Sequence, residues 1–286
     1  MKIHREGALH MALQKNEYST LKQVIVCPPT YMEITTIINE TQKHFIDENI
    51  DKVKADKQHD RFTEILREHN VETISLDAKK HLNEQVFTRD IGFTIDETVF
   101  ISQMARDIRK EEVHILEDYL NQKEIPSIRL QEHSIEGGDI IVHEDVIYVG
   151  ISKRTTPKAV EELQNHVSDK QIISLPIRED VLHLDCAFNI ISNEHALIYT
   201  PAFQQEDIEQ LERQFTLIET PEDEQLSLAT NVFSIGNKTV ISLPENKKTN
   251  QALRDRGYHV IETDFSEIIK SGGSFRCCTM PIQRQK

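Results

Sequence analysis

At 286 residues, the chain is long enough for one large domain or two ordinary ones, and 38% hydrophobic residues are enough for a sizeable core. Its 33 basic and 48 acidic side chains give a net charge of −15, which disfavours nucleic acid and anionic membranes and is compatible with a cationic small molecule. We expect a cytoplasmic protein, because no apolar run approaches the roughly 18 residues of a membrane span, no secretory signal is evident, and the four cysteines suggest no disulfide framework.

The first predicted elements are a strand at 21–29, helices between 34 and 69, and a strand at 71–76. From residue 90 onward, each segment reads as a hairpin of two apolar strands, an amphipathic helix and a third strand. The predicted hairpins are 91–102, 140–152, 186–200 and 232–243, the helices are 111–121, 155–167, 206–214 and 250–258, and the third strands are 127–132, 170–177, 216–220 and 259–264. Thr156 and Pro157 are typical of a helix start, and Gly257 is typical of a helix end.

Five residues mark this repeat: Asp90, Asp139, Asp185, Asn231 and Cys277, separated by 49, 46, 46 and 46 positions. A period near 50 indicates repeated supersecondary units. Pairing the strand after Cys277 with the N-terminal strand completes a fifth unit, closes a ring and removes free sheet edges. We therefore predict one α/β domain, residues 1–286, with five pseudosymmetric ββαβ units. A doubly wound parallel sheet is the alternative, and the hairpin turns argue against it.

Equivalent positions of the repeat converge in a closed ring, so residues at or near these positions are candidates for an active site. Among them, the thiol of Cys277 and the imidazole of His183, two residues before Asp185, are the candidate reactive groups. Cys277 follows a glycine-rich turn and is the expected nucleophile, whereas Cys278 should point into the core. Cys27 and Cys186, within apolar strands, are expected to be inert buried thiols. The segment 181–185 reads as a strand whose alternation turns His183 and Asp185 to the same side; a satisfied structural pair is the alternative.

Acidic turns precede two of the hairpins. Glu136–Asp139 reads Glu-Gly-Gly-Asp, and Phe87–Asp90 reads Phe-Thr-Arg-Asp. Acidic turns are usually solvated, but these lie at one end of the predicted ring. Convergent carboxylates without metal-ligand spacing suit a planar cation, and a guanidinium offers five donors in a fixed fork. We expect no metal and no organic cofactor.

The chain resembles the guanidine-modifying, or pentein, superfamily of arginine deiminases, dimethylarginine dimethylaminohydrolases and amidinotransferases. The resemblance covers essentially the full length. It depends on four motifs in order: FTRD at 87–90, EGGD at 136–139, HLD at 183–185 and GGSFRCCTMP at 272–281. It implies a five-bladed α/β propeller, which agrees with the repeat.

The resemblance also implies roles for particular residues. Cys277 matches the nucleophile, His183 the general acid/base and Glu136 the carboxylate that orients the histidine. Further positions match substrate-binding groups: Asp90 and Asp185 for the guanidinium, Phe87 within its motif, Glu84 near the α-amino group, and Arg109 and Arg154 for the carboxylate. An ordinary solvated charge at a helix end is the alternative for both arginines.

The implied activity is cysteine-dependent hydrolysis of arginine or an N-methylated arginine to citrulline plus ammonia or an alkylamine, through a covalent thiouronium intermediate. The partner is a cationic guanidino molecule. The compact length and Glu84 resemble the dimethylarginine hydrolases, whereas FTRD and HLD resemble the deiminases, so the substrate stays open. Amidino transfer to an amine acceptor and a catalytically silent guanidine-binding protein are the alternatives.

Overall fold

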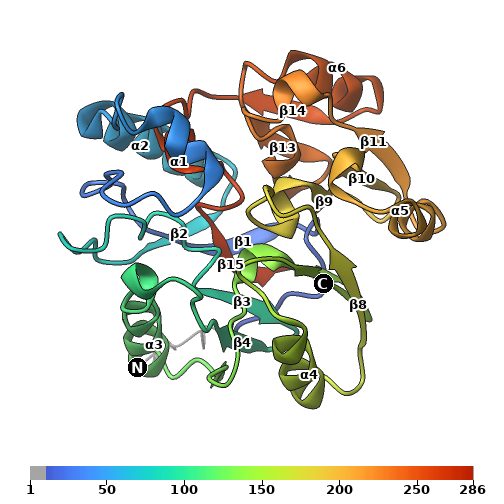
Figure 1. Ribbon diagram of the computed structural model, residues 1–286, viewed down its shortest axis with the longest axis horizontal. Helices are drawn as coiled ribbons and strands as arrows, with labels where there is room; N and C mark the ends of the chain where they lie inside the picture. Colours follow the sequence, from blue (N-terminus) through green and yellow to red (C-terminus); the bar gives the residue numbers. More distant parts are fainter. Residues whose placement is uncertain (1–10, 286) are drawn as a thin grey trace, which may run out of the picture.

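The computed structural model describes residues 11–285, which form five three-stranded sheets arranged around the middle of the molecule (Figure 1). In each sheet, the central strand pairs antiparallel on one side and parallel on the other. Helices α2 to α6 lie on the outside. This arrangement confirms the predicted α/β fold of five ββαβ units. No helix in the described part of the chain is long and apolar enough to cross a membrane.

Four of these units follow one another along the chain, and their strands and helices match the predicted order. Their elements are β3 (Gly92–Ile95), β4 (Thr98–Ile101), α3 (Glu112–Gln122) and β5 (Ser127–Arg129); β6 (Ile140–His143), β7 (Val146–Ile151), α4 (Pro157–His166) and β8 (Gln171–Pro176); β9 (Phe188–Ile190), β10 (His195–Ile198), α5 (Gln205–Glu212) and β11 (Thr216–Glu219); and β12 (Phe233–Gly236), β13 (Thr239–Ser242), α6 (Lys247–Asp255) and β14 (His259–Glu262).

The remaining sheet combines the two ends of the chain. Strand β15 (Met280–Arg284) pairs antiparallel with β1 (Leu21–Val26), which pairs in parallel with β2 (Glu72–Ser75). Helices α1 (Glu40–Phe45) and α2 (Lys52–Glu68) connect β1 to β2. Because β15 begins at Met280, Cys277 lies in the turn before the strand.

Helix boundaries show where local signals suffice and where they do not. Thr156 caps α4 by accepting the Ala159 N–H, as its sequence predicts. Helix α6 begins at Lys247, three residues before the predicted residue 250. A distant carboxylate caps this end of the helix: Glu224 accepts the N–H groups of Lys248 (2.6 Å) and Thr249 (3.0 Å). A cap from 24 residues away leaves no local pattern in the sequence.

An aromatic cluster fixes the segment that leads to Cys277. The buried Phe275 ring stacks on Phe265 with centroids 4.4 Å apart and lies 5.3 Å from Phe62 of α2. Each buried aromatic ring contributes roughly 1.5–3 kcal/mol relative to exposure. This packing holds the end of the chain against α2 and thereby places the turn before β15.

Candidate active site

A small cavity lies where the turns that precede the hairpins meet. Seven of the nine predicted site residues line it: Glu84, Phe87, Asp90, Arg109, Arg154, His183 and Cys277. The other two, Glu136 and Asp185, are fully buried and contact His183 and Cys277. The structure therefore brings all nine together from four different units.

Hydrogen bonds join the turns of successive units, and we call the five repeat residues and these bonds the central ring. The bonds run from Arg89 N–H to Cys277 O (3.0 Å), from Gly137 N–H to Asp90 O (3.1 Å), from Leu184 N–H to Asp139 Oδ1 (2.8 Å), from Asn231 Nδ2 to Asp185 O (3.1 Å) and from Cys277 N–H to Asn231 Oδ1 (3.2 Å). Asn231 thus holds the Asp185 and Cys277 turns together, a role that the sequence did not indicate.

The backbone before Cys277 needs its glycines. Gly272 has φ +96°, which a residue with a side chain rarely adopts. A Cβ at Gly273 would collide with the Phe87 ring and lie 2.9 Å from Cys277 Cβ. Cys277 is 2% exposed, and its Sγ lies 3.9 Å from both Asp185 oxygens. The close packing of Phe87, Gly273 and Cys277 sets the edge of the cavity.

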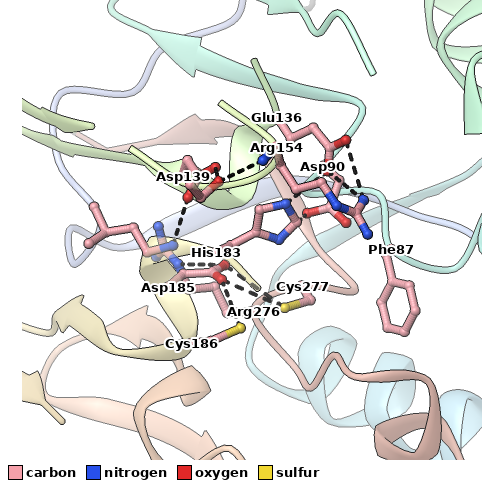
Figure 2. A network of polar contacts seen from close by, with 12 residues as sticks. Phe87, Asp90, Glu136, Asp139, Arg154, His183, Asp185, Cys186, Arg276 and Cys277 are labelled. Atoms are coloured by element: carbon pink, nitrogen blue, oxygen red, sulfur yellow. Dashed lines mark hydrogen bonds and ion pairs between the residues drawn. The ribbon is translucent and has the colours of Figure 1, made fainter. Parts of the chain in front are cut away.

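His183 lies between two carboxylates (Figure 2). Its Nε2 is 2.8 Å from Glu136 Oε2, and its Nδ1 is 3.5 Å from Asp90 Oδ1. The ring packs against Gly138, where a Cβ would approach Nδ1 to 2.7 Å. Burial alone would lower the pKa of His183, but Asp90 and the hydrogen bond to Glu136 outweigh it and raise this pKa to about 10. The imidazole is therefore protonated near neutral pH and can donate a proton.

Glu136 has the converse environment. Burial would raise its pKa, yet the hydrogen bond from His183 and the charge of Arg154 lower it to about 2. Asp90 Oδ1 and His183 Nδ1 have no hydrogen-bond partner among the described residues. Buried polar atoms are normally hydrogen-bonded, whereas these two face each other only as an ion pair at 3.5 Å, in two residues that line the cavity.

Asp185 contacts Cys277 on one side and a buried arginine on the other. Its Oδ2 lies 3.4 Å from Arg276 Nε, and Arg276 also pairs with Glu17 at 2.9 Å. Burial raises the pKa of Asp185, and Arg276 partly opposes that effect. Asp185 is not among the described residues that line the cavity. It contacts Cys277 Sγ, and Cys277 lines the cavity.

Both predicted carboxylate-binding arginines are buried, so the solvated-charge alternative is wrong for each. Arg109 pairs with Asp90 at 2.6 Å and with Glu112 at 2.8 Å. Arg154 pairs with Glu136 at 3.2 Å and donates from Nη2 to Ile38 O at 2.9 Å. Each arginine thus faces the cavity while it neutralises a carboxylate of the site. Their role toward a ligand stays a prediction.

Residues 38–42, which the sequence analysis did not identify as part of the site, lie over the cavity, and we call them the covering segment. Ile38 and Asn39 line it, and Asn39 caps α1 while donating to Ser271 O at 2.9 Å. Gln42 of α1 donates to Glu84 Oε1 at 2.8 Å, and Ser271 Oγ donates to the same carboxylate at 3.0 Å. Burial raises the pKa of Glu84 to about 7, although Arg109 opposes the shift.

The strand predicted at 181–185 is wrong. His183 is extended, with φ −140° and ψ 165°, but Leu184–Cys186 form a short 3₁₀ helix, η3. The turn forms because Asp139 Oδ1 accepts the Leu184 N–H from the neighbouring unit. Cys186 accordingly lies in η3 and not in a strand, whereas Cys278 is buried in the core as predicted.

Two groups of potential metal ligands occur in the described residues: Asp90, Glu136 and His183, and Asp185, Cys186 and Cys277. In each group the donor atoms lie within 4.8 Å of one another. His183 Nε2 in the first group is already bonded to Glu136. The expectation of a reaction without metal stays a prediction.

Comparison with known proteins places this site in a family. The family model described as N,N dimethylarginine dimethylhydrolase, eukaryotic, matches residues 28–284. An uncharacterized protein of Bacillus subtilis (strain 168), YkgA, is 51% identical over 275 residues, which cover 96% of each chain. An arginine deiminase of Listeria welshimeri is 29% identical over 273 residues, covering 72% of this chain and 67% of its own length.

Solved structures share the fold. The N-terminal domain of ArgZ, an arginine dihydrolase from the ornithine-ammonia cycle in cyanobacteria, has a TM-score of 0.86 at 21% identity and covers 92% of this chain and 98% of its own. SxtG, an amidinotransferase from Microseira wollei in the saxitoxin biosynthetic pathway, has a TM-score of 0.85 at 16% identity, covering 96% and 98%. The chain therefore belongs to the N,N-dimethylarginine dimethylhydrolase family, within the pentein superfamily of guanidine-modifying enzymes.

Proposed function

We propose that the protein hydrolyses the guanidinium group of arginine, or of a closely related guanidino compound, to a ureido product and an amine. For arginine the products are citrulline and ammonia. The observation that carries the proposal is one small cavity in which Cys277, the protonated His183 and the Asp90 carboxylate, whose Oδ1 accepts no hydrogen bond within the described part of the chain, converge. A planar cation with several N–H donors can bond the Asp90 carboxylate.

The proposed reaction has two halves. In the first, the Cys277 thiolate attacks the central guanidinium carbon, the carbon–sulfur bond forms, and the carbon–nitrogen bond breaks as His183 gives its proton to the departing amine. In the second, neutral His183 takes a proton from water while the resulting hydroxide attacks the thiouronium carbon. The carbon–sulfur bond then breaks, Cys277 leaves as thiolate, and the hydroxyl proton of the new ureido group passes to solvent or to the released amine.

Charge balance explains why substrate and thiolate should enter this site together. Asp90, Glu136 and Asp185 surround His183 and Cys277, so a thiolate alone adds negative charge to an acidic site. A bound guanidinium supplies the opposing charge. Arg276, 3.4 Å from Asp185, contributes a second buried positive charge on the far side of that carboxylate.

The other residues that line the cavity suit the remaining groups of an amino-acid substrate. We assign Arg109 and Arg154 to the α-carboxylate, Glu84 to the α-amino group and Phe87 to the methylene chain. For Arg154 this means exchanging its bond to Ile38 O for the ligand, which couples binding to the covering segment.

Amidino transfer begins with the same half-reaction and differs only in what resolves the thiouronium. A catalytically silent guanidine-binding protein lacks both halves. The complete set of thiol, imidazolium and orienting carboxylate favours an enzyme, and the small size of the cavity favours water over a second amine.

The test is product analysis with arginine, monomethylarginine, asymmetric dimethylarginine and agmatine, each with and without glycine or ornithine as acceptor. We expect citrulline from arginine and the methylarginines, with one ammonia per citrulline from arginine, and the ureido amine from any agmatine that is hydrolysed, all independent of acceptor. Cys277→Ser is the matched control and should form none. Acceptor-dependent amidino products would instead show transfer, and stoichiometric binding without product would show a silent binder.

A further inference from the structure

A second thiol lies beside the proposed nucleophile and has no part in the reaction above. Cys186, 3% exposed in η3, has its Sγ 3.7 Å from Asp185 Oδ1, and Cys277 Sγ lies 3.9 Å from the same oxygen. The two sulfur atoms are within 4.8 Å of each other. Figure 2 shows both sulfurs on the same side of the Asp185 carboxylate.

This separation is within reach of a covalent bond. A disulfide needs about 2 Å between sulfurs, so each Sγ has to move by no more than about 1.5 Å. The other two cysteines are placed differently. Cys27 follows β1 and contacts Pro28 O, and Cys278 is fully buried in the core, adjacent to Cys277 in sequence.

Cys186 also borders a second cavity, which opens beside α1. That cavity is lined by Cys186, Leu228 and Arg178, and it shares Asn39, Leu182 and Gly272 with the substrate cavity. The second cavity therefore reaches Cys186, whereas an oxidant reaches Cys277 through the substrate cavity.

We propose that Cys186 is a resolving thiol, which converts the oxidised nucleophile Cys277 into a reversible Cys186–Cys277 disulfide. With hydrogen peroxide as oxidant, the Cys277 thiolate attacks one peroxide oxygen, the oxygen–oxygen bond breaks, and hydroxide leaves, giving a sulfenic acid. Cys186 sulfur then attacks the Cys277 sulfur, the sulfur–oxygen bond breaks, and water leaves with the thiol proton, which Asp185 relays. The pair loses two hydrogens overall, and a dithiol reductant returns them.

The surroundings assign the order of these steps. The hydrogen bond with Cys277 and burial raise the pKa of Cys186 well above its ordinary value, so Cys186 stays a thiol while Cys277 reacts first. The bond removes the nucleophile from catalysis and also protects it from irreversible oxidation to the sulfinic acid. The loss of activity depends on the proposed function, but the bond itself does not.

The experiment compares the unmodified protein with Cys186→Ala and with the control Cys27→Ala, each treated with hydrogen peroxide in the presence of a metal chelator. Tryptic peptides 179–213 and 277–284 carry Cys186 and Cys277, so the bond appears as a cross-linked pair, and fragmentation distinguishes Cys277 from Cys278. Guanidine hydrolysis is measured before oxidation, after it, and after dithiothreitol.

We expect the unmodified protein and Cys27→Ala to lose two hydrogens, form the 186–277 pair, lose activity and recover it fully with dithiothreitol. Cys186→Ala should start with ordinary activity but lose it permanently, with Cys277 as sulfinic acid. Cys186→Ser replaces it if the alanine variant does not fold. Equal recovery in all variants, or a bond from Cys277 to Cys278, overturns the proposal. Peptide mapping detects the 186–277 bond or its absence even if no guanidine is hydrolysed, so the two proposals fail separately.

Discussion

The five members of the central ring occupy equivalent positions but divide into two groups. Asp139 and Asn231, the structural pair, have both side-chain polar atoms hydrogen-bonded: Asp139 accepts from Leu184 N–H and Ser152 Oγ, and Asn231 bonds Asp185 O and Cys277 N–H. Asp90, Asp185 and Cys277 are the reactive set: Asp90 and Cys277 line the cavity, and Asp185 contacts Cys277 Sγ. Asp90 Oδ1 accepts no hydrogen bond from the described residues. Residues at equivalent positions of the repeat therefore differ in function. The difference follows from whether the polar atoms of each side chain are already hydrogen-bonded within the protein.

We expect the largest effect on catalysis from removing the proposed nucleophile of the reactive set. Cys277→Ser should lower turnover by at least about 10³-fold, because a poorly activated hydroxyl replaces the thiolate. Cys278→Ser, the adjacent control, should change mainly the free energy of unfolding, by roughly 0.5–3 kcal/mol. The measurements are kcat for each variant and its urea denaturation curve. Reversed effects at the two positions would contradict the assignment.

The structural pair should affect catalysis only by positioning the residues of the reactive set. Asn231→Ala removes the bonds to Cys277 N–H and Asp185 O, so we expect kcat/KM to fall by about 10²-fold, the scale of a misplaced reactive group. It should also destabilise the fold by roughly 1–3 kcal/mol, since buried backbone groups lose partners.

Asn250→Ala is the matched control for Asn231→Ala. Asn250 is fully buried and donates to Leu243 O at 2.8 Å, but it belongs to α6, away from the cavity. A similar stability loss with nearly unchanged kcat/KM is expected for this control. Equal losses of kcat/KM in both variants would show that general destabilisation, rather than placement of Cys277, explains the effect.

Comparing two substrates tests the role of Asp185 within the reactive set. If Asp185 accepts guanidinium N–H bonds, dimethylation removes donors and leaves a buried acceptor unpaired at a cost of roughly 1–3 kcal/mol. We expect kcat/KM for asymmetric dimethylarginine to be about 5- to 150-fold below that for arginine, and Asp185→Ala to narrow the difference. Equal or higher kcat/KM for dimethylarginine in the unmodified protein would remove this role from Asp185.

The smallest expected effect concerns pH. Burial raises the pKa of Glu84 to about 7, so its carboxylate is protonated below that pH and ionised above it. If the ionised form binds the α-ammonium, kcat/KM for arginine should rise about fourfold between about pH 6.5 and pH 8. Glu84→Gln, or 5-guanidinopentanoic acid as substrate, should abolish this rise. A rise that persists in both cases assigns the titration to another group.

Much of the fold was predictable because the signal is local and repeated. Hairpin alternation, turn residues and the spacing of Asp90, Asp139 and Cys277 need no tertiary information. The same register predicted the cysteine and both acidic turns that reach the cavity. The 3₁₀ turn at Leu184 was not predictable, since it forms on an oxygen of Asp139, 45 residues away.

The covering segment was missed for a similar reason. Gln42 meets Glu84 and Ser271 across 42 and 229 residues, so neither contact produces a motif. Asn39 reads locally only as a helix cap. The solvated alternative for Arg109 and Arg154 failed because their carboxylate partners come from preceding turns of the ring, 19 and 18 residues earlier.

The most direct test of covalent guanidine chemistry at Cys277 is an acid quench during turnover of arginine, followed by tandem mass spectrometry of peptide 277–284. We predict an adduct on Cys277 with the mass of arginine less ammonia, absent from Cys277→Ser, which also forms no citrulline. An adduct on a different residue, or citrulline formed by Cys277→Ser at an undiminished rate, would contradict the assignment.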